Sequence, residues 1–143
     1  MSKVFEDEFM ELQSGLIALS IEATEGKVDK IFAYCSNEKN NKMFNAFFAV
    51  DGELKKLHQL NIPDGLIQKF LYIGTQDVVT LDAIGKKYNR RVPTELKLYY
   101  DVKSGRFDAK YQYDPVCVAE MGISQVQVYH DWISEVKEEY GLK

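Results

Sequence analysis

Residues 96–114 read LKLYYDVKSGRFDAKYQYD, and this stretch decides the fold. In its first half apolar and polar side chains alternate, which is the pattern of a strand that packs one face and leaves the other in water. Ser104 and Gly105 supply a turn, and the alternation resumes from Phe107 to Tyr113. The stretch therefore predicts an antiparallel hairpin. Its packed face is expected to carry Leu96, Leu98, Tyr100, Val102, Phe107, Ala109, Tyr111 and Tyr113.

Three further strands are predicted upstream of this hairpin. Residues 30–36 are rich in aromatic and branched side chains and form too short a run for a typical helix. Residues 43–50 are almost continuously apolar, which indicates a central strand. Asp51 and Gly52 then favour a two-residue type I′ turn, because both central positions of that turn need a positive φ. The turn leads into a third strand over residues 53–60, antiparallel to the second.

Three segments have the periodicity of amphipathic helices. Apolar residues recur on one helical face over residues 4–21 and again over residues 129–140, which Gly141 follows as a helix-ending residue. Residues 63–90 show the same spacing, but Gly74 interrupts it, so we expect either one kinked helix or two short ones. The predicted order of elements is α-βββ-α(α)-ββ-α.

This order predicts a single α+β domain over residues 1–143, with about five antiparallel strands and the helices packed on one face of the sheet. A chain of 143 residues suits one domain, and no repeat or linker divides it. With 45% hydrophobic and 28% charged residues, the composition is that of a folded globular protein and excludes disorder.

Charge, hydropathy and cysteine spacing together predict a cytoplasmic protein. Four of the first eleven residues are acidic and no apolar run follows them, which argues against a signal peptide. No stretch approaches the roughly 18 apolar residues of a membrane span. Cys35 and Cys117 lie far apart without CxxC spacing, so we expect two free thiols in a reducing compartment.

The residue patterns that carry enzymatic chemistry are missing from the sequence. His58 and His130 have no neighbours at metal-ligand spacing, and no nucleophile elbow, phosphate-binding loop or zinc-protease motif is present. Asp101 and Asp108 share the polar face of the hairpin at separations that glycosidases use. Three lysines share that face, however, and an open sheet surface gives no desolvation to separate the two pKa values. We therefore expect no catalytic residues, no metal and no cofactor.

Charge is distributed unevenly along the chain, which has a net charge of −4. Residues 86–91 (KKYNRR) form a basic cluster around a tyrosine, a pattern shared by nucleic-acid patches and by the solvated ends of helices. Residues 1–24 and 92–143 are both net acidic. If the first and last helices lie side by side, they present an acidic surface that steers a basic protein partner. We expect neither a nucleic acid nor a membrane as partner.

The hairpin and the last helix resemble a known family. The hydrophobic strand, glycine turn, phenylalanine and Tyr-x-Tyr-Asp pattern of residues 96–114 is similar to that of the YezG-like immunity proteins, which include the EsaG-type antitoxins of Gram-positive bacteria. Trp132 with Tyr140, Gly141 and Leu142 resembles the ending of the same family. The resemblance implies a non-catalytic cytoplasmic protein that binds the C-terminal toxin domain, often a nuclease, of a secreted polymorphic toxin.

The polar face of the hairpin is the predicted partner-binding surface, and the last helix is the second choice. Acidic side chains there suit the basic substrate side of a nuclease, and exposed aromatic side chains serve as anchors. Trp132 and Tyr111 are expected in the core, and self-association through other aromatic residues is left open. The predicted partner-binding residues are Tyr99, Asp101, Asp108 and Asp114 on the hairpin, and Glu135 and Glu139 on the helix.

Two other functions compete with this hypothesis. The first is a small ligand-binding or enzymatic α+β domain with a pocket between sheet and helices, lined by Phe and Tyr. A cavity with a carboxylate of shifted pKa favours it, whereas a filled core and an exposed acidic face favour the immunity protein. The second is an RNA-associated protein that works through residues 86–91, for which binding falls steeply with salt.

Overall fold

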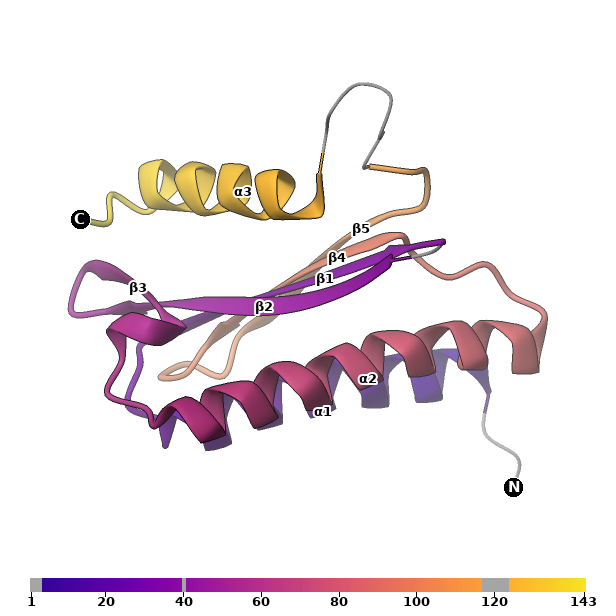
Figure 1. The fold of residues 1–143 in the computed structure, drawn as a ribbon, viewed down its shortest axis with the longest axis horizontal. Helices are drawn as coiled ribbons and strands as arrows, with labels where there is room; N and C mark the ends of the chain where they lie inside the picture. The colour runs from indigo at the N-terminus through magenta and orange to yellow at the C-terminus, as the bar shows by residue number, and fades with distance from the viewer. Residues whose placement is uncertain (1–3, 40, 117–123) are drawn as a thin grey trace.

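The computed structural model describes residues 4–39, 41–116 and 124–143. Five antiparallel strands form one sheet in the order β3-β2-β1-β4-β5, with helices above and below it (Figure 1). The elements are α1 (Phe5–Thr24), β1 (Lys30–Glu38), β2 (Asn41–Val50), β3 (Glu53–Lys56), a short 3-10 helix (Leu57–Gln59), α2 (Asp64–Tyr88), β4 (Glu95–Asp101), β5 (Phe107–Gln112) and α3 (Gln125–Glu139).

The predicted α+β class, element order and five-stranded antiparallel sheet are confirmed. Asp51 and Gly52 both have positive φ, as the type I′ turn requires. The third strand is shorter than predicted, because the chain turns into the 3-10 helix after Lys56. None of the helices in the described part of the chain is long and apolar enough to cross a membrane.

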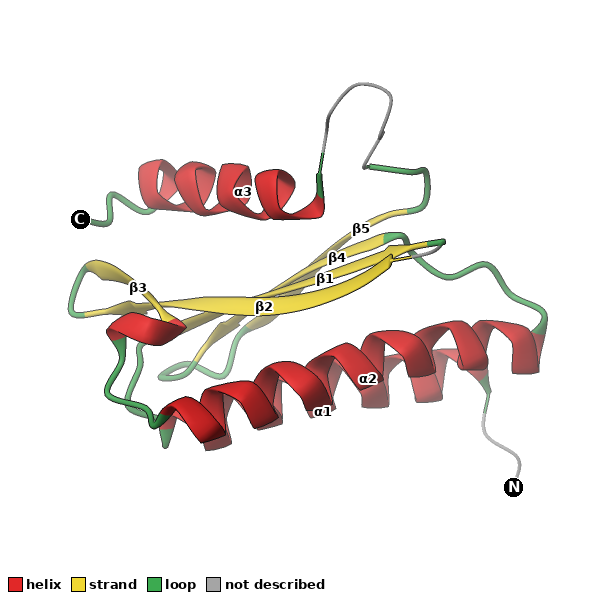
Figure 2. Ribbon diagram, viewed as in Figure 1, coloured by secondary structure: helices red, strands yellow, loops and turns green. Residues whose placement is uncertain are grey.

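The predicted placement of all helices on one face of the sheet is wrong. α1 and α2 lie together on one face and α3 covers the other (Figure 2). The reason is that β1 and β2 carry apolar side chains on both faces, and a strand of this kind needs a cover on each side. The first and last helices therefore do not lie side by side, and the combined acidic surface expected from them does not form.

The larger core lies between the sheet and the α1–α2 layer. Ile31, Ala33 and Cys35 of β1 point into it, together with Leu96 and Leu98 of β4. Cys35 is a buried free thiol, as predicted, while Cys117 lies outside the described residues. Burial, with a smaller contribution from the charge of nearby Asp77, raises the pKa of the Cys35 thiol far above its usual value.

The smaller core joins α3 to the opposite face of the sheet. Trp132 packs against the rings of Phe32 and Phe47, which stack on each other at a centroid distance of 4.9 Å. At the start of the helix, Gln125 Nε2 donates hydrogen bonds to the Ser36 hydroxyl at 2.7 Å and to a backbone carbonyl of β2. Trp132 is thus a core residue, as predicted, and α3 is fixed by polar as well as apolar contacts.

α2 runs through Gly74 as one helix, although this glycine was expected to kink or break it. The ring of Phe44, from β2, lies directly against the glycine, and a Cβ atom at position 74 would come within 2.1 Å of that ring. Gly74 therefore provides room for a close approach between helix and sheet. Its place in the sequence reflects packing and not a helix end.

We predict that Gly74→Ala destabilises the protein by about 1–3 kcal/mol, because the added methyl group overpacks the contact with Phe44. Gly15→Ala in the exposed part of α1 is the control, since a Cβ there meets no atom within 4 Å. That control should stabilise the protein by about 0.5–1 kcal/mol. Chemical denaturation of both variants measures the difference, and equal effects would contradict the packing role of Gly74.

Candidate functional site

Two of the predicted binding residues, Tyr99 and Asp101, form a cluster with Lys30 on the α3 face of the sheet. Lys30 Nζ lies 2.9 Å from Asp101 Oδ2 and 3.1 Å from the Tyr99 hydroxyl. Asp101 Oδ1 also accepts hydrogen bonds from the backbone N–H groups of Lys103 and Ser104 in the hairpin turn. The Ser104 N–H and the Lys30 ammonium hold the pKa of Asp101 well below its usual range. Asp101 thus stabilises the turn of the hairpin.

Tyr99 also lines a groove where the hairpin meets the end of α3. Asp108 and Glu139 line the same groove, which has a volume of about 170 Å³. The rings of Tyr99 and Tyr140 stack there at a centroid distance of 5.8 Å. The buried Trp132 also lines the groove. Three of the six predicted residues, from segments distant in sequence, are therefore brought together. We call this feature the hairpin–α3 groove.

The other predicted residues lie outside the hairpin–α3 groove. Asp114 follows β5 and forms an ion pair with Arg91 at 3.2 Å. Glu135 is exposed on α3, one turn of helix before Glu139.

Asp108, inside the groove, lies 3.3 Å from Arg106, and both side chains are largely exposed. Pairs of this kind are weak and exchange partners easily.

Sequence reasoning missed the cationic and aromatic residues of the groove. Lys97 lies over the Trp132 ring, with its Nζ 5.8 Å from the ring centroid, and Tyr140 stacks on Tyr99. These contacts depend on α3 covering the hairpin face of the sheet, which was predicted to be open. The apolar residues of β1 on both faces, such as Phe32, were the signal that a second cover was needed.

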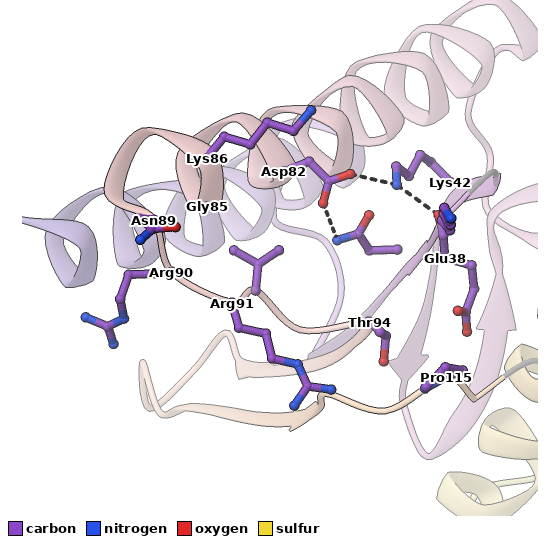
Figure 3. A pocket seen from close by; sticks show the side chains of 13 residues that line it. Glu38, Lys42, Asp82, Gly85, Lys86, Asn89, Arg90, Arg91, Thr94 and Pro115 are labelled. Atoms are coloured by element: carbon purple, nitrogen blue, oxygen red, sulfur yellow. Dashed lines mark hydrogen bonds and ion pairs between the residues drawn. The ribbon is translucent and has the colours of Figure 1, made fainter.

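A second hollow is a wide basic cleft of about 770 Å³ (Figure 3). It lies between the C-terminal end of α2, the segment that leads into β4, and the neighbouring ends of β1 and β2. Lys42 crosses it to Asp82 at 2.8 Å, and the Asn37 amide donates to the same carboxylate. Its cationic lining residues are Lys39, Lys42, Lys86, Arg90 and Arg91.

Acidic residues from elsewhere in the chain compensate much of the basic cluster 86–91. Lys87 lies 2.9 Å from Glu8, and Arg90 lies 3.2 Å from Glu6. The acidic start of α1 therefore faces the basic end of α2, and the cations also suit the negative end of the helix dipole. These contacts support the interpretation of the cluster as a helix end, with Arg91 paired separately to Asp114.

The two histidines, isolated in sequence, line one hollow of about 340 Å³ beside β2. Tyr129 and Asn45 also line it, and burial raises the pKa of the Tyr129 hydroxyl far above its usual value. Among residues 4–39, 41–116 and 124–143, no three His, Cys, Asp or Glu side chains come together as metal ligands. Sequence spacing gave no sign of this proximity, because His58 and His130 come from different layers of the fold.

No protein-family model matches the sequence, and no curated protein matches it. Functional inference therefore rests on the geometry of the hairpin–α3 groove and on the sequence pattern of residues 96–114.

We predict that Asp101→Asn lowers stability in a pH-dependent way. The pKa of this carboxyl is held below its usual value of 3.8 in the folded protein, so its charge stabilises the fold above that pH. The contribution is lost as the pH falls through the lowered pKa of the folded state. Unfolding measured from neutral pH to below 3.8 should therefore show a shrinking difference between wild type and variant.

Asp101→Ala separates the charge from the hydrogen bonds in this test. Asparagine keeps an oxygen that accepts from the backbone of Lys103 and Ser104, whereas alanine does not. The alanine variant should thus be the less stable of the two at every pH. A stability difference between wild type and Asp101→Asn that stays constant over the pH range would contradict the proposed charge effect.

Proposed function

We propose that this chain is a bacterial immunity protein, or antitoxin, of the YezG-like type that residues 96–114 resemble. It binds and neutralises the C-terminal toxin domain, a nuclease, of a secreted polymorphic toxin, and it acts in the cytoplasm without catalysis. The observation that carries this proposal is the hairpin–α3 groove, in which Tyr99, Asp108 and Glu139 meet. The proposed partner surface is this groove and the exposed side of α3.

The hairpin–α3 groove has the size to receive one side chain of a protein partner. Its volume of about 170 Å³ is smaller than the roughly 300–1,000 Å³ of most small-molecule pockets. Stacked Tyr99 and Tyr140 offer flat aromatic faces, and Asp108 and Glu139 stand at its edges as carboxylates. Lys97, Arg106 and Lys110 line the groove as well, and Lys30 already lies over the Tyr99 and Tyr140 rings. The negative charge that would attract a basic partner therefore comes mainly from the exposed side of α3. Rigid aromatic positions of this kind are frequent interface anchors.

The exposed side of α3 adds negative charge beside the groove. Surfaces that bind nucleic acid are basic, because they neutralise phosphate groups. An acidic surface docked on such a toxin competes with its substrate, and charge complementarity speeds the association. The exposed acidic residues of α3 are Asp131, Glu135, Glu138 and Glu139.

The alternative of a ligand-binding or enzymatic domain has less support. The two cores fill the space between sheet and helices with packed aromatic and aliphatic side chains. The basic cleft is large enough for a ligand, but charged side chains line it, and Lys42 is paired with Asp82 and Arg91 with Asp114. Ligand pockets are usually more apolar and more enclosed.

The proposal is tested by identifying the partner and its toxicity. The tagged chain is used to capture proteins from its native cells, and mass spectrometry identifies what co-elutes in stoichiometric amount. We expect a secreted multidomain protein whose isolated C-terminal domain kills cells, and expect co-expression of this chain to prevent the killing. Killing that continues despite co-expression of a domain bound by this chain would overturn the proposal.

We predict that Glu135→Lys combined with Glu139→Lys weakens toxin binding by about tenfold or more, because it places positive charge where the basic partner docks. Glu22→Lys combined with Glu25→Lys is the matched control, since it changes the net charge by the same amount at exposed positions at the end of α1, on the opposite side of the sheet. Affinity is measured by titration calorimetry and protection by cell survival. Equal effects of the control and the double variant would contradict the assigned surface.

A further inference from the structure

β5 forms one edge of the sheet, and no strand among the described residues pairs with its outer side. The opposite edge is different. β3 spans only Glu53–Lys56, and the backbone of Lys143 hydrogen-bonds to Gly52 and Leu54 beside it. An edge strand presents a row of backbone donors and acceptors that can pair with another chain. β5 is therefore the edge whose outward-facing backbone groups are available to pair with another strand.

The hairpin geometry determines which residues of β5 direct their backbone groups outward. Asp101 N–H donates to the Arg106 carbonyl at 2.9 Å, which makes these opposite residues a hydrogen-bonded pair. Such pairs alternate along an antiparallel ladder, so Asp108 and Lys110 direct their backbone groups toward β4. The backbone groups of the residues between and beside them point out of the sheet. These outward-facing residues are Phe107, Ala109 and Tyr111.

We propose that β5 pairs antiparallel with β5 of a second copy of this chain, about a two-fold axis through Ala109. In this register Ala109 faces Ala109 of the second copy, and Phe107 faces Tyr111. All three outward-facing residues then take hydrogen-bonded positions. An antiparallel pair requires this, because only residues whose backbone groups point toward the partner strand can form its hydrogen bonds. The small side chain of Ala109 stands at the centre of the contact, on the two-fold axis.

Charge complementarity favours this register over the one centred on Tyr111. Asp108 and Lys110 lie on the same face, two residues apart and exposed, so the two-fold axis places each opposite the other type in the second copy. They occupy non-hydrogen-bonded positions, where opposite side chains are closest. A register centred on Tyr111 instead would put Asp108 opposite Asp114, and like charges directly opposite each other are unfavourable.

The α1 side of the strand supplies apolar contact for the same pairing. Phe107 and Tyr111 are half-buried, and both pack on the larger core. Beside Phe107 lies an open hollow of about 260 Å³ that includes Ile17 and Ile21 of α1. Pairing of the edges continues the sheet across both copies and extends this apolar surface, so aromatic side chains meet across the join.

The first test is the mass of the full chain in solution over micromolar to millimolar concentrations. Sedimentation and light scattering should show the mass rising toward about 33 kDa, twice the 16.5 kDa of one chain. Ala109→Pro should abolish this rise. Proline removes an N–H that faces outward, and edge strands tolerate it, so the monomer should stay folded by circular dichroism. A wild-type chain that stays at the mass of one copy throughout would overturn the proposal.

Charge exchange tests the register independently of the proline variant. Asp108→Lys alone and Lys110→Asp alone each place like charges opposite each other, and we expect each to weaken dimerisation by about tenfold. The double exchange restores opposite charges and should recover the wild-type dissociation constant. A double variant as weak as the singles would exclude this register. Because Ala109 also lines the hairpin–α3 groove, Ala109→Pro is read by mass and circular dichroism only, and the capture and co-expression tests of toxin binding use the unaltered chain. Dimerisation and toxin binding can therefore fail separately.

Discussion

The apolar character of both faces of β1 and β2 is the constraint on which the rest of the structure depends. β1 directs Ile31 and Ala33 toward the α1–α2 layer and Phe32 and Tyr34 toward α3, and all four are nearly inaccessible to water. Leaving either set exposed would forfeit a large part of the hydrophobic free energy that holds the fold. The sheet therefore becomes the middle of three layers, with a pair of helices on one side and a single helix on the other.

The groove assigned to partner binding is a consequence of this layering. α3 is too narrow to cover the whole sheet, so it packs on the central strands and leaves the outer part of the hairpin open beside its C-terminal end. Tyr99 lies at the boundary, where one side of its ring contacts the core and its hydroxyl meets Lys30. Asp108 and Lys110 of β5 therefore line a groove together with residues of α3.

Local signals in the sequence predicted the elements well, and their failures concern contacts between distant segments. The alternation in residues 96–114 and the Asp51-Gly52 turn depend on neighbours along the chain, so both were readable. Three features depend on packing across layers and were not readable. These are the uninterrupted helix at Gly74, the shared hollow of His58 and His130, and the compensation of the basic end of α2 by the acidic start of α1.

The attachment of α3 also has a spectroscopic consequence. Trp132, the single tryptophan of the sequence, lies in the smaller core and touches none of the α1–α2 layer. Local openings of a protein differ in free energy from one cooperative unit to another. Tryptophan fluorescence therefore reports on the contact between α3 and the sheet, while far-ultraviolet circular dichroism follows mainly the two long helices. If α3 detaches first under denaturant, the fluorescence transition has a lower midpoint than the circular dichroism transition. The difference between the two midpoints then measures how independently α3 can unfold from the rest of the protein.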